Sequence, residues 1–589
     1  MLIVEEKRGI IESQLKEYFY DFPGRKPRRM VGKRDENGER LIPWTAELGP
    51  VMLARHIADR LARNGIIDLT ARAEQVVDAP QPIEVTGAPR TPYFCSGCPH
   101  NSSTRIPEGS QAFAGIGCHF MASWMNRNTT SLIQMGGEGV NWVARSRFNG
   151  NRHVFQNLGE GTYYHSGSLA IRQAIAAGTN ITYKLLYNDA VAMTGGQNVD
   201  GPISVEAIAR SVLVEGAKRV VMVSDQPGAL PRVPGVQTYN RSEMDRVQRD
   251  LREIPGTTVL IYQQTCATEK RRLRKRGKME DPKRFAVINP LVCEGCGDCS
   301  VESNCLSIEP LETEFGRKRQ VNLDTCNKDF TCLNGFCPSF VTVEGATPKT
   351  GAAAGEAAFH RLSKGLHHPE LPPLDQPWDI VVTGVGGTGV VTVGQLIAMA
   401  ANLEDKGTSV LDFMGFAQKF GPVISYIRIG RTSAAVNQVR VEPASADALI
   451  GCDIVVSSSP KASQTFHSGT RGVVNTAVMP TGDLVQNRDA DLNADARLTA
   501  IAERLGAVTP FDANALCKRL LGETVFANVM MLGAAWQAGL VPVSHDALMR
   551  AIDLNGVRPD ENKRAFGWGQ IAAQDLQAVV EIAGIRKPP

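Results

Sequence analysis

A Gly-Glu-Gly turn between a strand-like run and a helix-like run is the feature that most constrains the fold of this chain. The run His153–Leu158 leads into Gly159-Glu160-Gly161, and Asn188 follows the next strand-like run, Ile181–Tyr187. This order predicts a βαβ unit whose two strands lie side by side and parallel. Because the carboxyl ends of parallel strands share one edge, where open α/β sheets bind ligands, we expect Glu160 and Asn188 to converge.

The oxygen atoms expected at this edge predict a magnesium–diphosphate site. Glu160, Asn188 and a main-chain carbonyl near Ala190 offer three hard oxygen ligands, and octahedral Mg²⁺ would take further oxygens from two phosphates. The helix that begins after Gly161 points free N–H groups at the anion. This arrangement is the thiamine-diphosphate signature, Gly-Asp-Gly followed by a later Asn, with Glu160 in place of the Asp.

The cysteines are concentrated in one segment, because seven of the 13 lie between Cys293 and Cys337. Such a density indicates metal ligation in a reducing compartment and not a disulfide framework. A C-x2-C-x2-C run completed by a remote Cys-Pro is typical of bacterial ferredoxins, where the fourth cysteine of one run ligates the other cluster. A first [4Fe–4S] cluster is therefore expected on Cys293, Cys296, Cys299 and Cys337.

The remaining cysteines of this segment are one short of a second complete cluster. Cys305, Cys326 and Cys332 would hold a three-cysteine cluster, borrow a non-cysteine ligand, or belong to a degenerate site. Zinc is the alternative for the whole group, although zinc sites favour paired cysteines. Outside this segment, Cys266 is expected to be a small buried hydrophobic residue.

A second glycine-rich turn lies near the C-terminal end of the sequence. Gly384, Gly386 and Gly389 form G-x-G-x-x-G between a strand-like run and a helix-like run, and Asp412 ends the next strand-like run. Taken alone, this pattern is a dinucleotide fingerprint. It supports the alternative of a flavin- or nicotinamide-dependent oxidoreductase.

Four stretches in order carry a family resemblance: YFCSGCPHN (93–101), GIGCH (115–119), GEGTYYHSG (159–167) and YNDAVAMTGGQ (187–197). Together they resemble the thiamine-binding half of the indolepyruvate:ferredoxin oxidoreductases, within the 2-oxoacid:ferredoxin oxidoreductase superfamily. The resemblance covers roughly residues 90–589. It implies an α/β multidomain fold with a thiamine-diphosphate-binding parallel-sheet domain, a small ferredoxin-like insert and a C-terminal doubly wound gamma-type domain.

The resemblance also sets the expected domain boundaries. Residues 1–88 are the tail of a missing upstream domain and a linker, 89–268 the diphosphate-binding domain, 269–345 a basic linker and the ferredoxin-like iron–sulfur domain, 346–375 a linker, and 376–589 the gamma-type domain. The basic run within 269–284 is expected to be solvated, with a docking patch for an acidic electron carrier as the alternative.

The resemblance extends the set of expected site residues beyond those that the strand geometry indicates. The cofactor-binding set comprises Cys95, Cys98, His100, Gly117, Cys118, Gly159, Glu160, Gly161, Thr162, Asn188 and Ala190, of which Glu160, Asn188 and Ala190 bind Mg²⁺. His165 and Tyr163 either face the reacting carbon as catalytic residues or pack the first helical turn. In the family, Cys95, Cys98 and His100 line the cofactor pocket and do not hold a metal. Half of a zinc site is the alternative for the two cysteines, but no second cysteine pair lies nearby in the sequence.

In the gamma-type domain the resemblance extends to GFAQKFGPVISYIRIG (415–430). The family's domain binds no dinucleotide and packs on the thiamine domain, with a contribution to coenzyme A capture. Lys419 and Arg428 would either meet phosphate or carboxylate or be ordinary surface charges.

The implied reaction is oxidative decarboxylation of an aryl 2-oxoacid, of the indolepyruvate type, to an aryl-acetyl-CoA. Thiamine diphosphate, Mg²⁺ and one or two [4Fe–4S] clusters are the cofactors, coenzyme A is the co-substrate, and ferredoxin takes the electrons. A pyrimidine-binding domain or subunit must come from a partner or a missing segment, and a dimer or larger assembly is expected. A non-catalytic electron-transfer or assembly subunit with a decayed thiamine site is the other alternative.

Charge and hydropathy restrict the setting. A net charge of +3 gives no global reason to expect nucleic acid binding. No apolar run approaches the roughly 18 residues of a membrane span, and the acidic start does not resemble a signal peptide. We therefore expect a cytoplasmic protein.

Overall fold

The computed structural model describes residues 1–45, 47–74, 81–85, 87–150, 152–199, 201, 204–346, 355–414 and 419–585. Most of the Ala/Gly-rich start of the expected 346–375 linker, and residues 415–418 of the 415–430 motif, lie outside these ranges. The chain divides into two compact units. The first is Met1–Pro82 with Glu442–Ser445 and Gln464–His467, and the second is Ile83–Val441, Ala446–Ser463 and Ser468–Pro589.

The first unit is small and has three helices, α1 (Ile10–Tyr20), α2 (Pro50–Arg63) and α3 (Thr70–Glu74). The carboxylate of Glu5 accepts the N–H groups of Ile10, Ile11 and Glu12, which satisfies the free donors at the start of α1. Its buried apolar side chains include Ile3, Val31 and Ile42.

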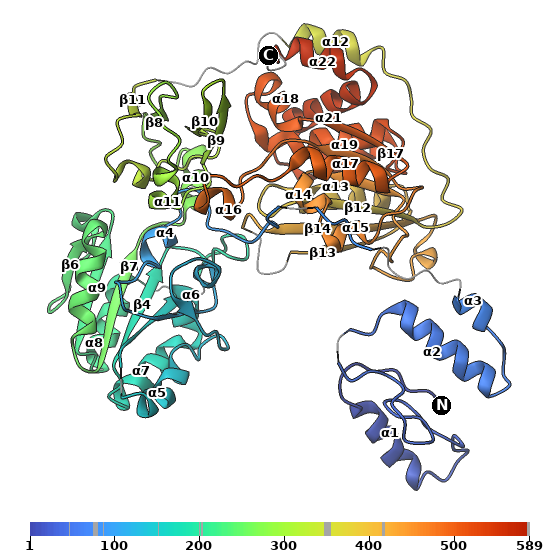
Figure 1. Cartoon of the computed structure of the whole chain (residues 1–589), viewed down its shortest axis with the longest axis horizontal. Coiled ribbons are helices and arrows are strands. Elements are labelled where there is room, and N and C mark those ends of the chain that lie inside the picture. Colours follow the sequence, from blue (N-terminus) through green and yellow to red (C-terminus); the bar gives the residue numbers. More distant parts are fainter. Residues whose placement is uncertain are drawn as a thin grey trace. The chain divides into compact units, whose positions relative to one another are not determined.

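A seven-stranded sheet organises the first half of the second unit (Figure 1). Its order is β2-β1-β3-β4-β7-β5-β6, and every pair of neighbours is parallel. The strands are β1 (Ala112–Phe113), β2 (Thr129–Thr130), β3 (Val154–Gly159), β4 (Ile181–Tyr187), β5 (Arg219–Ser224), β6 (Gln237–Asn240) and β7 (Thr257–Gln263). The predicted parallel sheet is confirmed.

Helices pack against both faces of this sheet. The side chains of α5 (Val140–Arg145), α7 (Ser168–Ala176) and α8 (Val205–Val214) share one apolar core with β3, β4, β5 and β7. Those of α9 (Met244–Arg252) form a separate core with the alternate strand residues, because successive strand side chains point to opposite faces. Short helices α4 (His100–Ser103) and α6 (Glu160–Thr162) lie near the carboxyl edge of β3 and β4.

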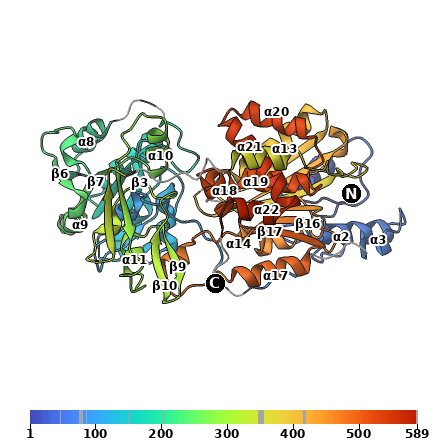
Figure 2. The same cartoon turned by 90° about the horizontal axis from the view of Figure 1, so that it is seen from above.

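The cysteine-rich segment folds as two antiparallel strand pairs. β8 (Arg284–Ile288) pairs with β11 (Phe340–Glu344), and β9 (Ile308–Thr313) pairs with β10 (Gly316–Val321). Helix α11 (Asp298–Ser303) and the turn η6 (Thr331–Leu333) follow the two cysteine runs and pack together. Figure 2 shows α11 beside β9 and β10.

A six-stranded sheet organises the remainder of the second unit, in the order β13-β14-β12-β15-β16-β17. Its strands are β12 (Trp378–Val385), β13 (Gly407–Phe413), β14 (Pro422–Gly430), β15 (Ala448–Gly451), β16 (Arg471–Asn475) and β17 (Ala507–Phe511). β14 runs antiparallel to both neighbours, whereas the other pairs are parallel.

Six described helices contribute to the apolar core against this sheet: α13 (Val390–Leu403), α18 (Ala513–Leu520), α19 (Ala527–Gln537), α20 (His545–Asn555), α21 (Pro559–Gln574) and α22 (Leu576–Ile582). The other described α-helices of this part are α12 (Glu356–Ser363), α14 (Ile454–Ser457), α15 (Pro460–Ser463), α16 (Gly482–Gln486) and α17 (Ala494–Arg504). Among the described residues, no helix combines the length and apolar character needed to cross a membrane.

Candidate functional site

Glu160 and Asn188 meet at the carboxyl edge of β3 and β4. The parallel register places Gly159 opposite Leu186, so the residues that leave each strand are neighbours. Oε1 of Glu160 accepts the N–H of Asn188 at 2.8 Å and the N–H of Ala190 at 3.2 Å. The structure thus brings the Glu160 carboxylate to the main chain of Asn188 and Ala190.

The oxygen atoms at this edge are of the kind that coordinates a cation. Burial raises the pKa of Glu160 to about 7, even though the N–H donors of Asn188 and Ala190 oppose that shift. The Oδ1 of Asn188 is buried and has no hydrogen-bond partner among the described residues. A buried carboxylate and an unpaired amide oxygen are unfavourable alone, and an oxygen-preferring cation such as Mg²⁺ would satisfy both.

A tight helical start follows Glu160. Helix α6 runs directly into a π-helical turn, Tyr163–Gly167, and then into α7. Such π-turns occur frequently at functional sites. Thr162 Oγ1 donates to the carbonyl of Ile116 at 3.5 Å, which ties this start to the Gly115–Cys118 loop.

The two expected catalytic residues do not line the cavity that contains Asn188. Tyr163 is buried in the apolar core with Phe113 and Trp142, so its side chain packs the helical start. His165 is exposed, and its Nδ1 lies 2.6 Å from Ser166 Oγ. Of the two expected placements, the structure shows the packing one for Tyr163.

Four cysteines surround this cavity. Cys95, Cys98, Cys118 and Cys266 are all buried and belong to one apolar cluster. Cys266 follows β7, and its N–H donates to the carbonyl of Asn188 at 3.0 Å. The interpretation of Cys266 as an isolated hydrophobic residue therefore missed a neighbour of the cofactor edge.

Four convergent thiols are the ligand number of a structural zinc site or a [4Fe–4S] cluster. Burial raises the pKa of Cys98 well above its usual range and that of Cys118 to about 12, so these thiols are neutral without a metal. The cation of Lys419, which also lines the cavity, opposes the shift at Cys118. Within the described ranges, no three His, Cys, Asp or Glu side chains are spaced for a single metal ion.

Two buried histidines lie near the cysteines, and one of them, His100, lines the same cavity. The rings of His100 and His119 are 5.7 Å apart, and His119 Nε2 has no partner among the described residues. Burial lowers the pKa of His119 to about 4, so the ring is neutral near neutral pH. Gly117 has a φ of +145°, and a Cβ added there would lie 2.7 Å from the His119 ring. Gly117 therefore permits the close approach of this ring.

The ferredoxin-like segment separates its cysteines into two groups. The thiol of Cys299 has the thiols of Cys296, Cys293 and Cys337 as its charged neighbours, and burial raises its pKa to about 11. Burial raises the pKa of the Cys332 thiol to about 12, and the thiols of Cys305, Cys326 and, least of the three, Cys299 add to that shift. Apart from the interaction of Cys332 with Cys299, these neighbours agree with the two sets that the spacing predicts, and the assignment of the sets to iron–sulfur clusters stays a prediction.

The second group lies next to the four-cysteine cavity. The hydroxyl of Ser96 and the N–H of Gly97 both interact with the Cys305 thiol. Asn327 Nδ2 donates to the carbonyl of Ser96 at 2.8 Å. In contrast, Cys296 of the first group is exposed. The second group is therefore the inner one and the first group the outer one.

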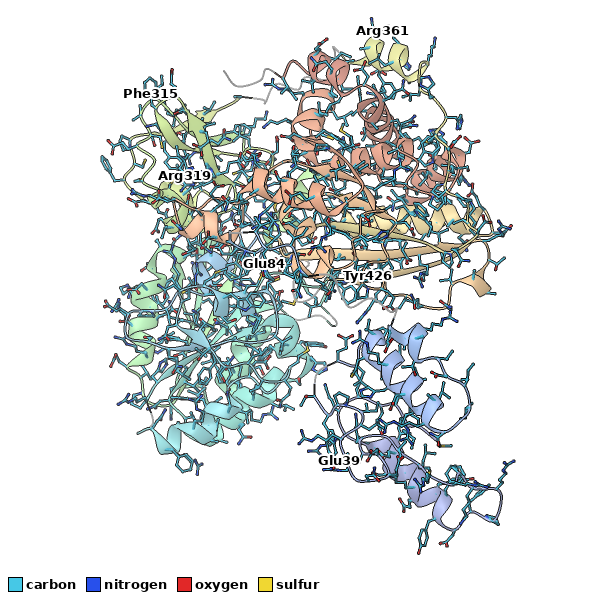
Figure 3. The ribbon with its side chains drawn as sticks, turned by 45° about the vertical axis from the view of Figure 1, so that its right-hand side comes forward. Glu39, Glu84, Phe315, Arg319, Arg361 and Tyr426 are labelled. Carbon is cyan, nitrogen blue, oxygen red and sulfur yellow. The ribbon has the colours of Figure 1, made fainter. Side chains whose placement is uncertain are left out.

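A buried arginine lies beside the first group. Arg319 on β10 is 1% exposed, and Figure 3 shows it below Phe315 of the same hairpin. Its Nη2 donates to the carbonyl of Arg488 at 3.3 Å, while Nε and Nη1 have no partner among the described residues. A Cβ added to Gly297 would lie 3.4 Å from Nη2. The guanidinium thus places positive charge where a thiolate-bound cluster would be negative.

Two family models match the ends of the chain. The model described as an indolepyruvate oxidoreductase domain matches residues 1–81, and that of pyruvate ferredoxin/flavodoxin oxidoreductase matches residues 379–569. The indolepyruvate oxidoreductase subunit IorA of Thermococcus kodakarensis is 23% identical over 363 residues, which cover 53% of this chain and 53% of the relative. The subunit IorB of Methanothermobacter thermautotrophicus is 27% identical over 201 residues, covering 33% of this chain and 98% of the relative.

The chain is therefore similar to indolepyruvate oxidoreductase subunits over much of its length. It spans about half the length of the IorA relatives that it matches. One solved structure with a similar fold is the pyruvate oxidoreductase subunit PORC of Thermotoga maritima, with a TM-score of 0.25 and 21% identity, covering 33% of this chain and 96% of that one.

The second glycine-rich turn of this chain is not laid out as a dinucleotide site. β14 lies between β12 and β13, so Asp412 is one strand removed from the strand that carries Gly384. Ser425 donates a hydrogen bond to the Asp412 carboxylate, and Asn528 Nδ2 donates to the carbonyl of Thr388 at 2.9 Å. The polar groups that a dinucleotide would use are thus engaged within the protein.

The expected anion-binding cations of this part differ in their surroundings. Arg428 forms a buried two-bond ion pair with Asp379, at 2.7 Å from Nε to Oδ1 and 2.5 Å from Nη2 to Oδ2. It is therefore a structural residue, neither a ligand contact nor a surface charge. Lys419 is buried at the four-cysteine cavity, so this part of the chain contributes to the candidate site.

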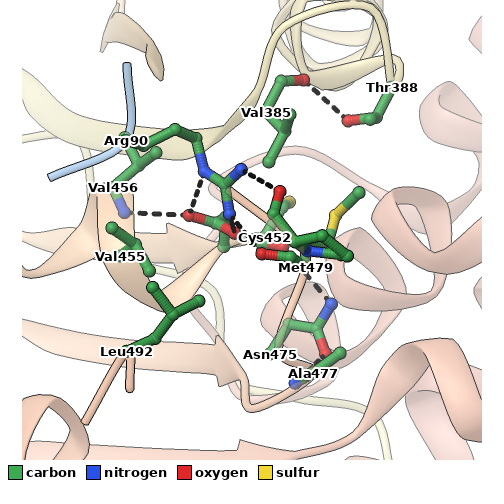
Figure 4. A network of polar contacts seen from close by, with 12 residues as sticks. Arg90, Val385, Thr388, Cys452, Val455, Val456, Asn475, Ala477, Met479 and Leu492 are labelled. Carbon is green, nitrogen blue, oxygen red and sulfur yellow. Dashed lines mark hydrogen bonds and ion pairs between the residues drawn. The ribbon is translucent and has the colours of Figure 1, made fainter. Parts of the chain in front are cut away.

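The segment before the cofactor cavity is fixed by a buried ion pair (Figure 4). Nη2 of Arg90 lies 2.8 Å from Asp453 Oδ2 and also donates to the carbonyl of Met479 at 2.9 Å. Oδ1 of Asp453 accepts the N–H of Val456 at 2.9 Å. Tyr93 lies three residues after Arg90, and its Oη accepts a hydrogen bond from Gln486 Nε2 at 2.8 Å. These bonds attach the Cys95 loop to the six-stranded-sheet region.

The basic run expected to be a linker or docking patch is a helix, α10 (Ala267–Lys275). Arg271 donates to the carbonyl of Asp324, and Arg274 donates to the carbonyl of Asn327 at 2.9 Å. Both carbonyls flank Cys326 in the second cysteine group. The arginines therefore support the inner cysteine loop, which is why the run is ordered.

Proposed function

We propose that this chain is the diphosphate-binding and electron-transferring part of a 2-oxoacid:ferredoxin oxidoreductase that acts on an aryl 2-oxoacid of the indolepyruvate type and yields an aryl-acetyl-CoA. The observation that carries the proposal is the buried Glu160 carboxylate at the main chain of Asn188, whose own Oδ1 is buried and has no partner among the described residues. The family supports a 2-oxoacid oxidoreductase, and the names of the relatives suggest the aryl substrate.

The residues of the turn have distinct parts in this proposal. Glu160, Asn188 and the carbonyl near Ala190 would hold Mg²⁺, and the N–H groups at the start of α6 would face the diphosphate. Thiamine diphosphate supplies the decarboxylation chemistry when it is bound, while the chain positions it and excludes water. A partner domain or subunit would supply the pyrimidine contact, in a dimer or a larger assembly.

The cysteines define a route for electrons. The four-cysteine cavity adjoins Asn188, the second group adjoins Ser96 and Gly97, and the first group reaches the surface at Cys296. We infer that the four-cysteine set holds an iron–sulfur cluster and that electrons pass from it through the inner group to the outer group.

Exposed apolar side chains mark the exit of this route. Leu291 is 86% exposed two residues before Cys293, and Phe336 is fully exposed immediately before Cys337. Large exposed apolar residues beside the outer group fit a transient docking surface for ferredoxin. Replacing both by serine should raise the KM for ferredoxin and leave reduction of a small viologen dye unchanged.

The test is anaerobic purification of the chain alone and with the protein encoded beside it. We expect bound thiamine diphosphate, iron and sulfide, and indolepyruvate- and CoA-dependent viologen reduction only when the partner is present. Cys266→Ser should lower the iron content by about four atoms, the content of one cluster. Iron without thiamine diphosphate or activity in the complex would contradict the enzymatic proposal.

A non-catalytic electron-transfer subunit is the second candidate, because Glu160 replaces the usual aspartate and its carboxylate already accepts two N–H groups. Glu160→Asp separates the two. An active enzyme should keep thiamine diphosphate in this variant and lose it in Glu160→Ala, with the brown colour retained in both. Negligible binding of thiamine diphosphate to the wild type and to both variants would favour the non-catalytic subunit.

A further inference from the structure

We propose that Asp329 is the fourth ligand of the inner iron–sulfur cluster, beside Cys305, Cys326 and Cys332. The inference rests on the proposed function only in requiring a cluster at this group. It resolves the shortage of one cysteine, because Asp329 stands three residues after Cys326 and three before Cys332. In the first run, Cys296 holds the same place between Cys293 and Cys299.

The two runs share one backbone conformation. In the first run, the second and fourth residues after Cys293 have positive φ, +73° at Gly295 and +85° at Gly297. In the second run, the second and fourth residues after Cys326 also have positive φ, +55° at Lys328 and +62° at Phe330. Asp329 therefore occupies the structural position of Cys296, and not merely the same place in the spacing.

The hydrogen bonds of the two loops agree as well. The N–H of Gly295 donates to the thiol of Cys293 at 3.4 Å, and the N–H of Lys328 donates to the thiol of Cys326 at 3.4 Å. A helical turn begins directly after the second positive-φ residue in each run, α11 in the first and η6 in the second. The second run thus retains the loop form of a complete ligand run.

The positive-φ conformation costs free energy in the second run, because the residues that adopt it there are not glycines. Glycine adopts positive φ freely, whereas Lys328 and Phe330 each carry a side chain, which costs of order 1 kcal/mol or more per residue. Arg271 and Arg274 of α10 donate to main-chain carbonyls on either side of Cys326 and help to hold this form. A loop without a ligand at position 329 would have no evident need for it.

Among the described residues, the hydrogen-bond donors around Asp329 engage only one of its two carboxylate oxygens. Arg241 Nη1 donates to Oδ1 at 2.6 Å and Gln264 Nε2 donates to the same oxygen at 2.9 Å. The side chain is 9% exposed, and a Cβ added to Gly97 would lie 2.8 Å from its Cβ. With Oδ1 oriented by these donors, Oδ2 would bind iron as Cys296 Sγ does in the first cluster.

A carboxylate ligand gives the inner cluster a distinct chemistry. Oxygen is a harder donor than thiolate sulfur and holds cluster iron less firmly. A one-electron oxidant such as ferricyanide would take one electron from [4Fe–4S]²⁺, and the resulting [4Fe–4S]³⁺ would release Fe²⁺ to leave [3Fe–4S]⁺. The iron lost is the one bound by Asp329, and the three cysteines keep the remainder.

The experiment measures cluster type and released iron in the anaerobically purified full chain, without any assay of activity. Under limiting ferricyanide the wild-type protein should release about one Fe²⁺ per chain to a chelator and gain the EPR signal of an oxidised three-iron cluster. Asp329→Cys should suppress both at least tenfold. Asp329→Asn should contain the three-iron cluster as isolated.

Two matched variants separate ligation from structure. Arg241→Gln removes the ion pair but keeps the carboxylate, and it should retain the wild-type response. Cys296→Asp moves the aspartate to the first run and should add a second three-iron signal. Equal iron release from wild type and Asp329→Cys, or an Arg241→Gln protein that matches Asp329→Asn, would overturn the assignment. An iron content unchanged by Cys326→Ser would overturn it too, while thiamine diphosphate binding tests the proposed function separately.

Discussion

The two glycine-rich turns of this chain look alike in sequence but differ in what surrounds them. The turn after β3 has a buried carboxylate, an unpaired amide oxygen and a parallel neighbour strand that ends beside it. The turn after β12 has an antiparallel neighbour on one side, and Asn528 bonds to it from α19. We therefore expect a ligand at a glycine turn only where adjacent strands bring buried oxygen atoms to it that the described protein leaves free to coordinate a cation.

The largest expected effect is on stability, from the loss of the buried ion pair between Arg90 and Asp453 near the second turn. Arg90→Met leaves Asp453 buried without its cation, which should lower the free energy of unfolding by about 3–5 kcal/mol. Chemical denaturation followed by circular dichroism measures the change. The matched control is Arg431→Met, whose ion pair with Asp375 is mostly exposed and should contribute less than about 1 kcal/mol. Similar losses in both variants would contradict a structural role for the buried pair.

The next effect concerns the first turn. Asn188→Ala removes the unpaired Oδ1, and the affinity for thiamine diphosphate with Mg²⁺ should fall at least about tenfold in the complex with the partner. Isothermal titration calorimetry measures it. Asn528→Ala at the second turn should leave this affinity unchanged, and a loss of the same size there would remove the distinction between the turns.

A pH effect distinguishes the strand that carries the first turn. Burial lowers the pKa of His153 from the ordinary 6.5 to about 4, and its Nε2 lies 2.7 Å from Thr182 Oγ1. The unfolded chain therefore binds a proton that the folded chain refuses, so this contribution to stability is lost as pH falls from 6.5 to 4. The slope should be at most about 1.4 kcal/mol per pH unit and should diminish in His153→Gln. An unchanged slope in that variant would assign the pH dependence to other groups.

The smallest effect is expected at Asp412. Asp412→Asn keeps a hydrogen-bond acceptor for Ser425, so the free energy of unfolding should change by about 1 kcal/mol or less. Calorimetry should detect no NADH or flavin binding in the wild type or in this variant. Binding that depends on Asp412 would restore the dinucleotide interpretation of the second turn.

Much of the first sheet could be predicted because its strands are short apolar runs and its connections are βαβ units. The same geometry predicted that Glu160 and Asn188 meet, and it could have included Cys266, which leaves β7 at the same edge. The position of Asp412 could not be predicted, because nothing in the local sequence shows that β14 inserts between β12 and β13.

The remaining differences have local causes. The dense positive charge of α10 suggested a solvent-exposed linker. Its arginines instead donate to carbonyls around Cys326, and these acceptors lie in a distant segment that the local sequence does not reveal. The sequence left two placements for the Tyr163 side chain, at the reacting carbon or packed on the helical start. The structure places it in the apolar core with residues of α5 and β1. Residue patterns thus located the candidate site, while the satisfaction of individual polar groups required the fold.

The most direct test of the central claim is a Mn²⁺ titration followed by EPR, with Mn²⁺ in place of Mg²⁺ and the chain in its complex. The wild type should bind one Mn²⁺ per chain tightly only when thiamine diphosphate is present, and Glu160→Ala should lose that site while Asp412→Ala keeps it. Equal thiamine-dependent Mn²⁺ binding in wild type and Glu160→Ala would contradict the claim that the first glycine turn is the cofactor site.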